Sequence, residues 1–238
     1  MDAVILAAGV GKRMQGITRA YYKPLLRVNG VPLVRAAVKL AINAGVDVPV
    51  VVVAPQNADV IDQTLADLPA TLIVQRTPDG PGDALRVGLQ VRGPRASYRV
   101  LVLLADNVTT DEDVRNVIQF ETAVGVNEIP RSDAGRYTRF DPDLNDWVEK
   151  VPITDLDGPP MECWVGPFVG WRDKMEPVLE EVWFNAKRDG VEALIGPHLG
   201  KFMCTELKSA RVRVSSVDVG TVDAFAKARG WGREEEKS

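Results

Sequence analysis

The sequence is poor in the residues that most often carry nucleophilic, metal and redox chemistry. Its 238 residues include two cysteines, Cys163 and Cys204, and one histidine, His198. Two cysteines at this spacing form neither a disulfide framework nor a zinc site, so we expect buried free thiols. No nucleophile or metal cluster surrounds His198 in the sequence, and we expect this side chain to be structural.

Long apolar runs and a large excess of charge are missing too. No run approaches the roughly 20 residues that span a bilayer, and the start, Met1-Asp2-Ala3, lacks the basic leader of a secretory signal. We therefore expect a cytoplasmic protein with no membrane partner. The net charge of -4 and the pI near 5.2 argue against a nucleic-acid-binding protein, which would show a basic face. Small anionic ligands held by local cations fit this composition.

The chain begins with an apolar strand that runs into a turn rich in glycine and positive charge. Glycine has no Cβ, so the backbone of such a turn can bend tightly and bring its N–H groups close to an anion. Lysine and arginine side chains add formal positive charge beside it. The residues concerned are Ala8, Gly9, Gly11, Lys12, Arg13 and, further on, Lys23.

Two better-known glycine-rich loops do not fit this turn. The Walker A loop needs a glycine where Leu6 stands and a serine or threonine where Arg13 stands. The dinucleotide-binding fingerprint fails because Met14 occupies the position of its third glycine. An ordinary strand-to-helix turn with a solvated basic edge stays the alternative to a phosphate site.

The first half of the chain alternates apolar strands with helical patterns, which predicts a parallel sheet with helices on both faces. Ligands of such sheets bind at the carboxyl ends of the strands. Gly9, Gln75 and Asp106 all follow or end predicted strands there. The expected strands are residues 3–6, 48–54, 71–75 and 99–104, and the expected helices are residues 32–44, 59–67 and 83–91.

The second half is less regular and predicts an extension of the sheet with a small lobe. We expect strands at residues 137–140, 147–151, 163–169 and 211–217, helices at residues 174–186 and 222–228, and a disordered charged tail at residues 233–238.

Two aspartates stand at the ends of apolar strands, Asp106 in the first half and Asp218 in the second. A carboxylate at the mouth of a sheet can bind Mg²⁺, which prefers oxygen ligands and takes substrate phosphates as the others. Helix caps or turn formers are the alternative for each aspartate.

Several motifs follow in order along the chain. They are Leu6-Ala7-Ala8-Gly9-Val10-Gly11-Lys12-Arg13-Met14, Lys23-Pro24-Leu25, Gln75 with Pro78-Asp79-Gly80, Leu104-Ala105-Asp106-Asn107, Val148-Glu149-Lys150-Val151-Pro152 and Asp218-Val219-Gly220-Thr221. This series resembles the sugar-1-phosphate nucleotidylyltransferases, closest to the glucose-1-phosphate thymidylyltransferase and uridylyltransferase branch. Members of the family transfer a nucleoside monophosphate from an NTP to a sugar 1-phosphate and release pyrophosphate.

The resemblance implies a glycosyltransferase-A-like α/β fold with a Rossmann-like mixed, mostly parallel sheet and a small sugar-binding lobe. It implies one domain, residues 1–232, with a nucleotide part at about residues 1–120 and a sugar part at about residues 121–232. The implied catalytic residues are Arg13 and Lys23; those for the nucleotide are Ala8, Gly9, Gly11, Lys12, Gln75, Gly80 and Asp106; those for the sugar phosphate are Glu149, Lys150 and Gly166; and those for Mg²⁺ are Asp106 and Asp218. The implied substrates are an NTP and a sugar 1-phosphate, and a homo-oligomer is compatible with the family.

The residue type at position 75 bears on the base. An amide offers a donor and an acceptor, which match the N3–H and carbonyl groups of thymine or uracil, whereas guanine suits a carboxylate. Gln75 therefore favours dTTP or UTP, with ATP as an alternative. Departures from the family's pattern at Thr138, Phe168 and residues 192–200 leave the sugar open. Two other functions stay open: a cytidylyl- or guanylyltransferase for another phosphate, and a catalytically silent sugar-nucleotide-binding subunit.

Overall fold

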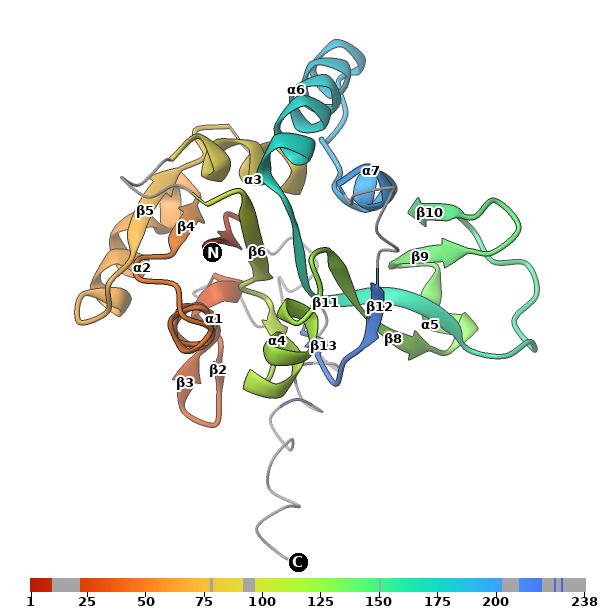
Figure 1. Ribbon diagram of the computed structural model, residues 1–238, viewed down its shortest axis with the longest axis horizontal. Coiled ribbons are helices and arrows are strands. Elements are labelled where there is room, and N and C mark those ends of the chain that lie inside the picture. Colours follow the sequence, from red (N-terminus) through yellow and green to blue (C-terminus); the bar gives the residue numbers. More distant parts are fainter. Residues whose placement is uncertain are drawn as a thin grey trace, which may run out of the picture.

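The computed structural model describes residues 1–9, 22–77, 79–91, 97–149, 151–202 and 210–219, with Phe225 and Ala228. Within these residues nine strands form one mixed sheet (Figure 1). They are β1 (Asp2–Ala7), β4 (Val50–Val53), β5 (Thr71–Val74), β6 (Arg99–Leu104), β8 (Ala123–Ile129), β9 (Thr138–Asp141), β10 (Asp146–Glu149), β11 (Met161–Trp171) and β12 (Ala210–Arg213).

The strands follow the order β10-β9-β11-β6-β1-β4-β5, and β8 pairs with both β11 and β12. In the first half β6, β1, β4 and β5 are all parallel, with Leu6 level with Val52 on one side and Leu104 on the other. Strand β11 then joins β6 in antiparallel fashion, so the sheet continues into the second half. The predicted mixed α/β sheet is confirmed, and its parallel part places the ends of β1, β5 and β6 at one edge.

Helices cover both faces of the parallel strands. Because successive side chains of a strand point to opposite faces, Ile5 of β1 packs on one side and Val4 on the other. Helices α1 (Leu33–Asn43), α2 (Ala58–Leu65) and α4 (Asp111–Ile118) pack on the face of Ile5, and α3 (Pro81–Gln90) and α6 (Arg172–Asp189) on the face of Val4. Gly88 allows α3 to approach closely, since a Cβ there would lie 2.6 Å from Val4 Cγ1.

Local sequence explains several of the element ends. Asn29 and Gly30 have φ of 49° and 79°, which is the geometry of a tight hairpin turn, and they join β2 (Arg27–Val28) to β3 (Val31–Pro32). Gly190, with φ of 68°, ends α6 in the left-handed conformation that glycine adopts without strain.

The elements that the sequence did not predict include α4, β8 and the short α5 (Arg131–Ala134). Helix α4 is short, begins with three acidic residues and has few apolar ones, so its apolar pattern extends over little more than one turn. Its signal is the capping box, in which Thr110 Oγ1 accepts from Asp113 N–H at 3.0 Å and Asp113 Oδ2 from Thr110 N–H at 3.1 Å.

The strand predicted at residues 211–217 is divided into β12 and β13 (Val217–Asp218). Between them Ser215 N–H donates to Asp113 Oδ1 at 2.7 Å, and Ser216 Oγ donates to Asp113 Oδ2 at 3.1 Å. These bonds to α4 take the chain out of the β8 ladder, and β13 pairs instead with β7 (Asn107–Val108). The predicted single strand was therefore wrong at its centre.

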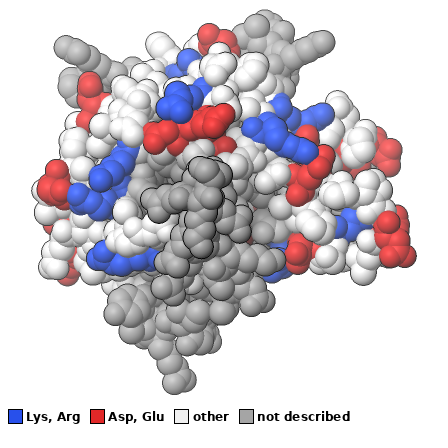
Figure 2. All heavy atoms as spheres, turned by 90° about the horizontal axis from the view of Figure 1, so that it is seen from below, with Lys and Arg blue, Asp and Glu red and all other residues white. Residues whose placement is uncertain are grey.

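Other sequence expectations concern the exterior and the thiols. None of the helices in the described part of the chain is both long and apolar enough to cross a bilayer. On the face shown in Figure 2, acidic and basic side chains alternate among the described residues.

Cys163 is buried and unpaired with another cysteine, and burial raises the pKa of its thiol to about 12. Cys204 lies outside the described residues.

Candidate active site

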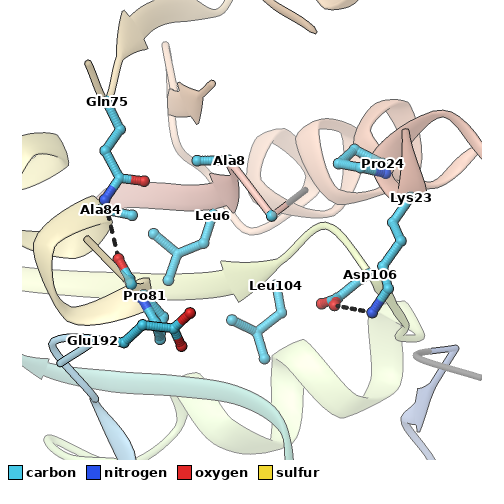
Figure 3. Close-up of a pocket in the computed structure, with 12 residues that line it drawn as sticks. Leu6, Ala8, Lys23, Pro24, Gln75, Pro81, Ala84, Leu104, Asp106 and Glu192 are labelled. Carbon is cyan, nitrogen blue, oxygen red and sulfur yellow. Dashed lines mark hydrogen bonds and ion pairs between the residues drawn. The ribbon is translucent and has the colours of Figure 1, made fainter. Parts of the chain in front are cut away.

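A cavity of about 210 Å³ lies at the carboxyl edge of the parallel strands (Figure 3). Its walls come from the ends of β1, β5 and β6, from the first turn of α3 and from η2 (Lys23–Leu25). Parallel strands end at a common edge, so residues far apart in the sequence meet here. The predicted site residues that line the cavity are Ala8, Gly9, Lys23, Gln75, Gly80 and Asp106.

One end of the cavity carries a cation beside a carboxylate. Lys23 Nζ lies 3.5 Å from Asp106 Oδ2, and the two side chains point toward one another (Figure 3). Lys23 is held at the start of the 3-10 turn η2, where Leu26 N–H donates to the Lys23 carbonyl at 3.0 Å. The side chains are 14% and 35% exposed, so neither is fully buried.

Gln75 lies at the other end of the cavity. Its backbone N–H donates to Val53 O at 2.8 Å, which extends the β5 ladder by one residue. The buried side chain donates from Nε2 to Gly80 O at 3.1 Å and to Asp83 Oδ2 at 2.8 Å. Both amide N–H groups are therefore engaged within the protein. We expected Gln75 to offer a base both a donor and an acceptor, but only the acceptor, Oε1, is left for this.

Glu192 also lines the cavity, and the sequence did not reveal it. The segment after α6 docks on the loop before α3, because Ala193 N–H donates to Asp79 O at 2.7 Å and Gly82 N–H donates to Ala193 O at 2.8 Å. Gly80 has φ of 97°, and a Cβ there would lie 2.6 Å from Ala193 O. No spacing in the sequence indicates this contact, which depends on the packing of the two halves.

Asp218 reaches the same edge of the sheet through β13. It pairs with Asn107 in the ladder between β13 and β7, and Val219 N–H donates to Asp106 O at 3.0 Å. The backbones of the two predicted metal ligands therefore lie close together, with Asp106 just before β7 and Asp218 at the end of β13. The bonds from Ser215 and Ser216 to Asp113 hold the segment that leads into Asp218.

The donor set here fits a hard cation. Carboxylate oxygens suit Mg²⁺, which takes one or two of them and completes its shell with water and substrate phosphates. Among the described residues, no group of three or more His, Cys, Asp or Glu side chains lies together as a ready-made metal site. Two carboxylates, Asp106 and Asp218, are a set that would hold Mg²⁺ together with a phosphate ligand rather than alone.

Of the predicted sugar residues, Glu149 and Gly166 are described, and both lie outside the lining of this cavity. Glu149 Oε2 accepts a hydrogen bond from Thr138 Oγ1 at 3.1 Å and packs against Gly196. Gly166 lies against the β12–β13 connection, since a Cβ there would be 2.9 Å from Val214 Cγ2. The hydroxyl of Thr138 thus helps to hold the Glu149 carboxylate in place.

Tyr137 stands near the second aspartate. Burial, and next the negative charge of Asp218, raise the pKa of its hydroxyl to about 12, so it is a neutral hydrogen-bond donor at neutral pH.

Four of the predicted site residues fall outside the described part of the chain: Gly11, Lys12, Arg13 and Lys150.

Comparison with known proteins indicates the same family as the sequence motifs do. Residues 2–129 match the family described as Nucleotidyl transferase. A 2-aminoethylphosphonate cytidylyltransferase from Lancefieldella rimae is 42% identical over 46 residues, which cover 19% of each chain. A glucose-1-phosphate thymidylyltransferase from Neisseria gonorrhoeae is 30% identical over 113 residues, 45% of this chain and 38% of that protein. These matches span well under half the length of the relatives.

Solved structures share the fold over nearly the whole chain. A crystal structure named as a glucose-1-phosphate thymidylyltransferase from Bacillus anthracis, in complex with a sucrose, superposes with a TM-score of 0.78 at 19% identity, covering 98% of this chain and 96% of the other. A UDP-glucose pyrophosphorylase complexed with UDP-glucose gives a TM-score of 0.68 at 18% identity, covering 100% and 99%. At these identities the likeness concerns the fold.

Proposed function

This chain belongs to the nucleotidyl transferase family, and we propose that it transfers a nucleoside monophosphate from an NTP to a sugar 1-phosphate. The observation that carries the proposal is the cavity in which Lys23 and Asp106 face one another at one end and Gln75 lies at the other. Charged groups at one end suit phosphates, and a buried amide at the other suits a base. Leu6 and Leu104 line the space between them.

The reaction needs alignment more than proton transfer. An oxygen of the sugar phosphate forms a bond to the α-phosphorus of the NTP while the bond from that phosphorus to the β-phosphate oxygen breaks. Pyrophosphate leaves with the electron pair. The attacking oxygen is already ionised, so no general base is required, and catalysis reduces to positioning and charge stabilisation.

The residues of this chain divide these tasks. Lys23 neutralises the negative charge that develops at the reacting phosphate, and Arg13 from the glycine-rich turn serves the triphosphate. Asp106 and Asp218 would hold Mg²⁺, which supplies further charge neutralisation between the phosphates when bound. Glu149 would accept hydrogen bonds from the sugar hydroxyls, and Lys150 would bind the sugar's phosphate.

The base proposed is uracil or thymine, because Gln75 presents an acceptor to the cavity and the imide N3–H of these bases is a donor. Two relatives named as glucose-1-phosphate thymidylyltransferases support this choice.

A second candidate is a cytidylyltransferase for another phosphate or phosphonate. The relative from Lancefieldella rimae carries that name and has the highest identity of those described above, over a short segment. The 4-amino group of cytosine could also donate to the Gln75 oxygen.

One experiment separates these functions. Purified protein with Mg²⁺ is given each NTP together with a panel of sugar 1-phosphates, or with 2-aminoethylphosphonate, and pyrophosphate release is measured. Release with UTP or dTTP and a sugar 1-phosphate is the expected result. Release with CTP and the phosphonate alone would favour the second candidate. Tight binding of a sugar nucleotide without release under any condition would indicate a silent binding subunit.

A further inference from the structure

Asp83 sits behind Gln75, on the first turn of α3, and is itself buried. Its two carboxylate oxygens have different partners. Oδ2 accepts from Gln75 Nε2 at 2.8 Å, while Oδ1 accepts from Arg86 Nε at 3.0 Å and from Arg86 Nη2 at 2.8 Å. The carboxylate therefore joins the amide of the cavity to a guanidinium outside it.

Arg86 is held in turn by α6. Its Nη1 donates to Glu180 Oε1 at 3.2 Å, and its guanidinium lies 4.5 Å from the centre of the Trp183 ring. Arginine forks of this kind have a fixed, planar donor geometry. Because Arg86 is clamped by α6, the plane of the Asp83 carboxylate cannot turn freely, and Oδ2 stays directed at Gln75.

This arrangement allows the Gln75 amide only one orientation. Its two neighbours, Asp83 Oδ2 and Gly80 O, are both acceptors, so both must face the NH₂ group. A flipped amide would place Oε1 against two oxygens and leave both of them without this donor, which is costly in a buried site. In Figure 3 a dashed line joins the Gln75 amide nitrogen to its carbonyl acceptor, and the amide oxygen points in another direction.

We propose that Asp83 is a positioning residue that fixes Gln75 with Oε1 toward the nucleotide base, so that the site selects a base with an imide N–H. This rests on the proposed function. Uracil and thymine present N3–H at the centre of their pairing edge, whereas cytosine has a lone pair at N3. An acceptor fixed opposite N3 attracts the N3–H of uracil or thymine and repels the N3 lone pair of cytosine.

Two probes test the proposal by nucleotide binding, measured by isothermal titration calorimetry. The first compares UTP with 3-deazauridine 5′-triphosphate, in which a C–H replaces N3–H at nearly the same shape, and with CTP. We expect the analogue and CTP to bind the wild-type protein at least about tenfold more weakly than UTP. Inorganic tripolyphosphate, which has no base, measures the phosphate end alone.

The second probe is Asp83→Asn, which keeps the size of the side chain. The substituted amide would turn its oxygen to Arg86 and its NH₂ to Gln75, so the Gln75 amide loses its single orientation. We expect the preference for UTP over CTP to fall at least about tenfold while tripolyphosphate binding is unchanged. Asp62→Asn, the same change at an exposed position of α2, should keep the wild-type preference.

The outcomes are distinct. Equal binding of UTP and 3-deazauridine triphosphate, or an unchanged preference in a folded Asp83→Asn variant, would overturn the role of Asp83. Tighter binding of CTP than UTP by the wild type would overturn the imide assignment. If Asp83→Asn does not fold, the comparison of analogues on the wild type decides. A protein that shows the UTP preference but transfers no nucleotide would contradict the proposed function and leave this inference supported.

Discussion

Lys23 Nζ and Asp106 Oδ2 face one another at 3.5 Å at one end of the cavity. One residue comes from a short 3-10 turn near the start of the chain and the other from the end of β6. Each of these two charged groups is thus the other's ion-pair partner. In the proposed reaction a magnesium nucleotide would replace this pair, with Lys23 contacting a phosphate and Asp106 contacting the metal.

Lys23→Ala should abolish turnover and leave the fold intact, because Lys23 lines the cavity and is absent from the hydrophobic core. Removing one preorganised electrostatic contact costs about 2.7–4 kcal/mol in the transition state, or about 10²- to 10³-fold in kcat. Arg13→Ala should behave alike. Lys39→Ala, at an exposed position of α1, is the matched control. Wild-type turnover by Lys23→Ala, measured as pyrophosphate release, would remove this residue from the site.

Asp106→Asn and Asp218→Asn should each raise the Mg²⁺ concentration needed for half-maximal activity. An amide oxygen carries no net charge and attracts a hard dication less than a carboxylate does. The measurement is activity against free Mg²⁺ for both variants, with Asp141→Asn on β9 as a control away from the cavity. Full activity of the wild type in excess chelator would contradict the metal. If one variant alone responds, the other aspartate is a turn residue.

UTP or dTTP should exceed GTP in kcat/KM by at least roughly tenfold, about 1.4 kcal/mol. The fixed acceptor of Gln75 meets one N–H of a pyrimidine imide, and a base of a different shape leaves polar groups of the site unpaired. The comparison uses one sugar 1-phosphate at fixed Mg²⁺. Equal or better use of GTP would place the protein with guanylyltransferases instead.

The single histidine gives a test of stability against pH. Burial, aided by the positive charge of Lys201, lowers the pKa of His198 below its ordinary value near 6.5, although Glu181 and Asp146 act in the opposite direction. The unfolded chain therefore binds a proton more readily than the folded one, and the free energy of unfolding should fall as the pH drops below about 6.5.

His198→Gln should remove this part of the pH dependence. The check is the free energy of unfolding by urea at pH 5 and pH 7 for both proteins. The wild type should lose more stability between these values than the variant does. Equal losses would show that His198 is as readily protonated in the folded protein as in the unfolded chain.

Much of the architecture was predictable from local patterns. Apolar runs gave β1, β4, β5 and β6, and alternation with helical periodicity implied that these strands are parallel. From that alone, Gly9, Gln75 and Asp106 had to lie near one edge, because a parallel sheet brings the carboxyl ends of its strands together. Glycines and prolines marked the turns, since their backbone preferences are properties of single residues.

Tertiary structure decided the details on which the proposed selectivity depends. Glu192 reaches the cavity only because the Ala193 backbone bonds to the loop before α3, and Asp218 meets Asn107 only because Asp113 holds the serines before it. The orientation of the Gln75 amide depends on a carboxylate and, through Arg86, on a helix from the other half of the chain. Hydrogen-bond partners far apart in the sequence are chosen by packing, and local periodicity carries no record of that choice.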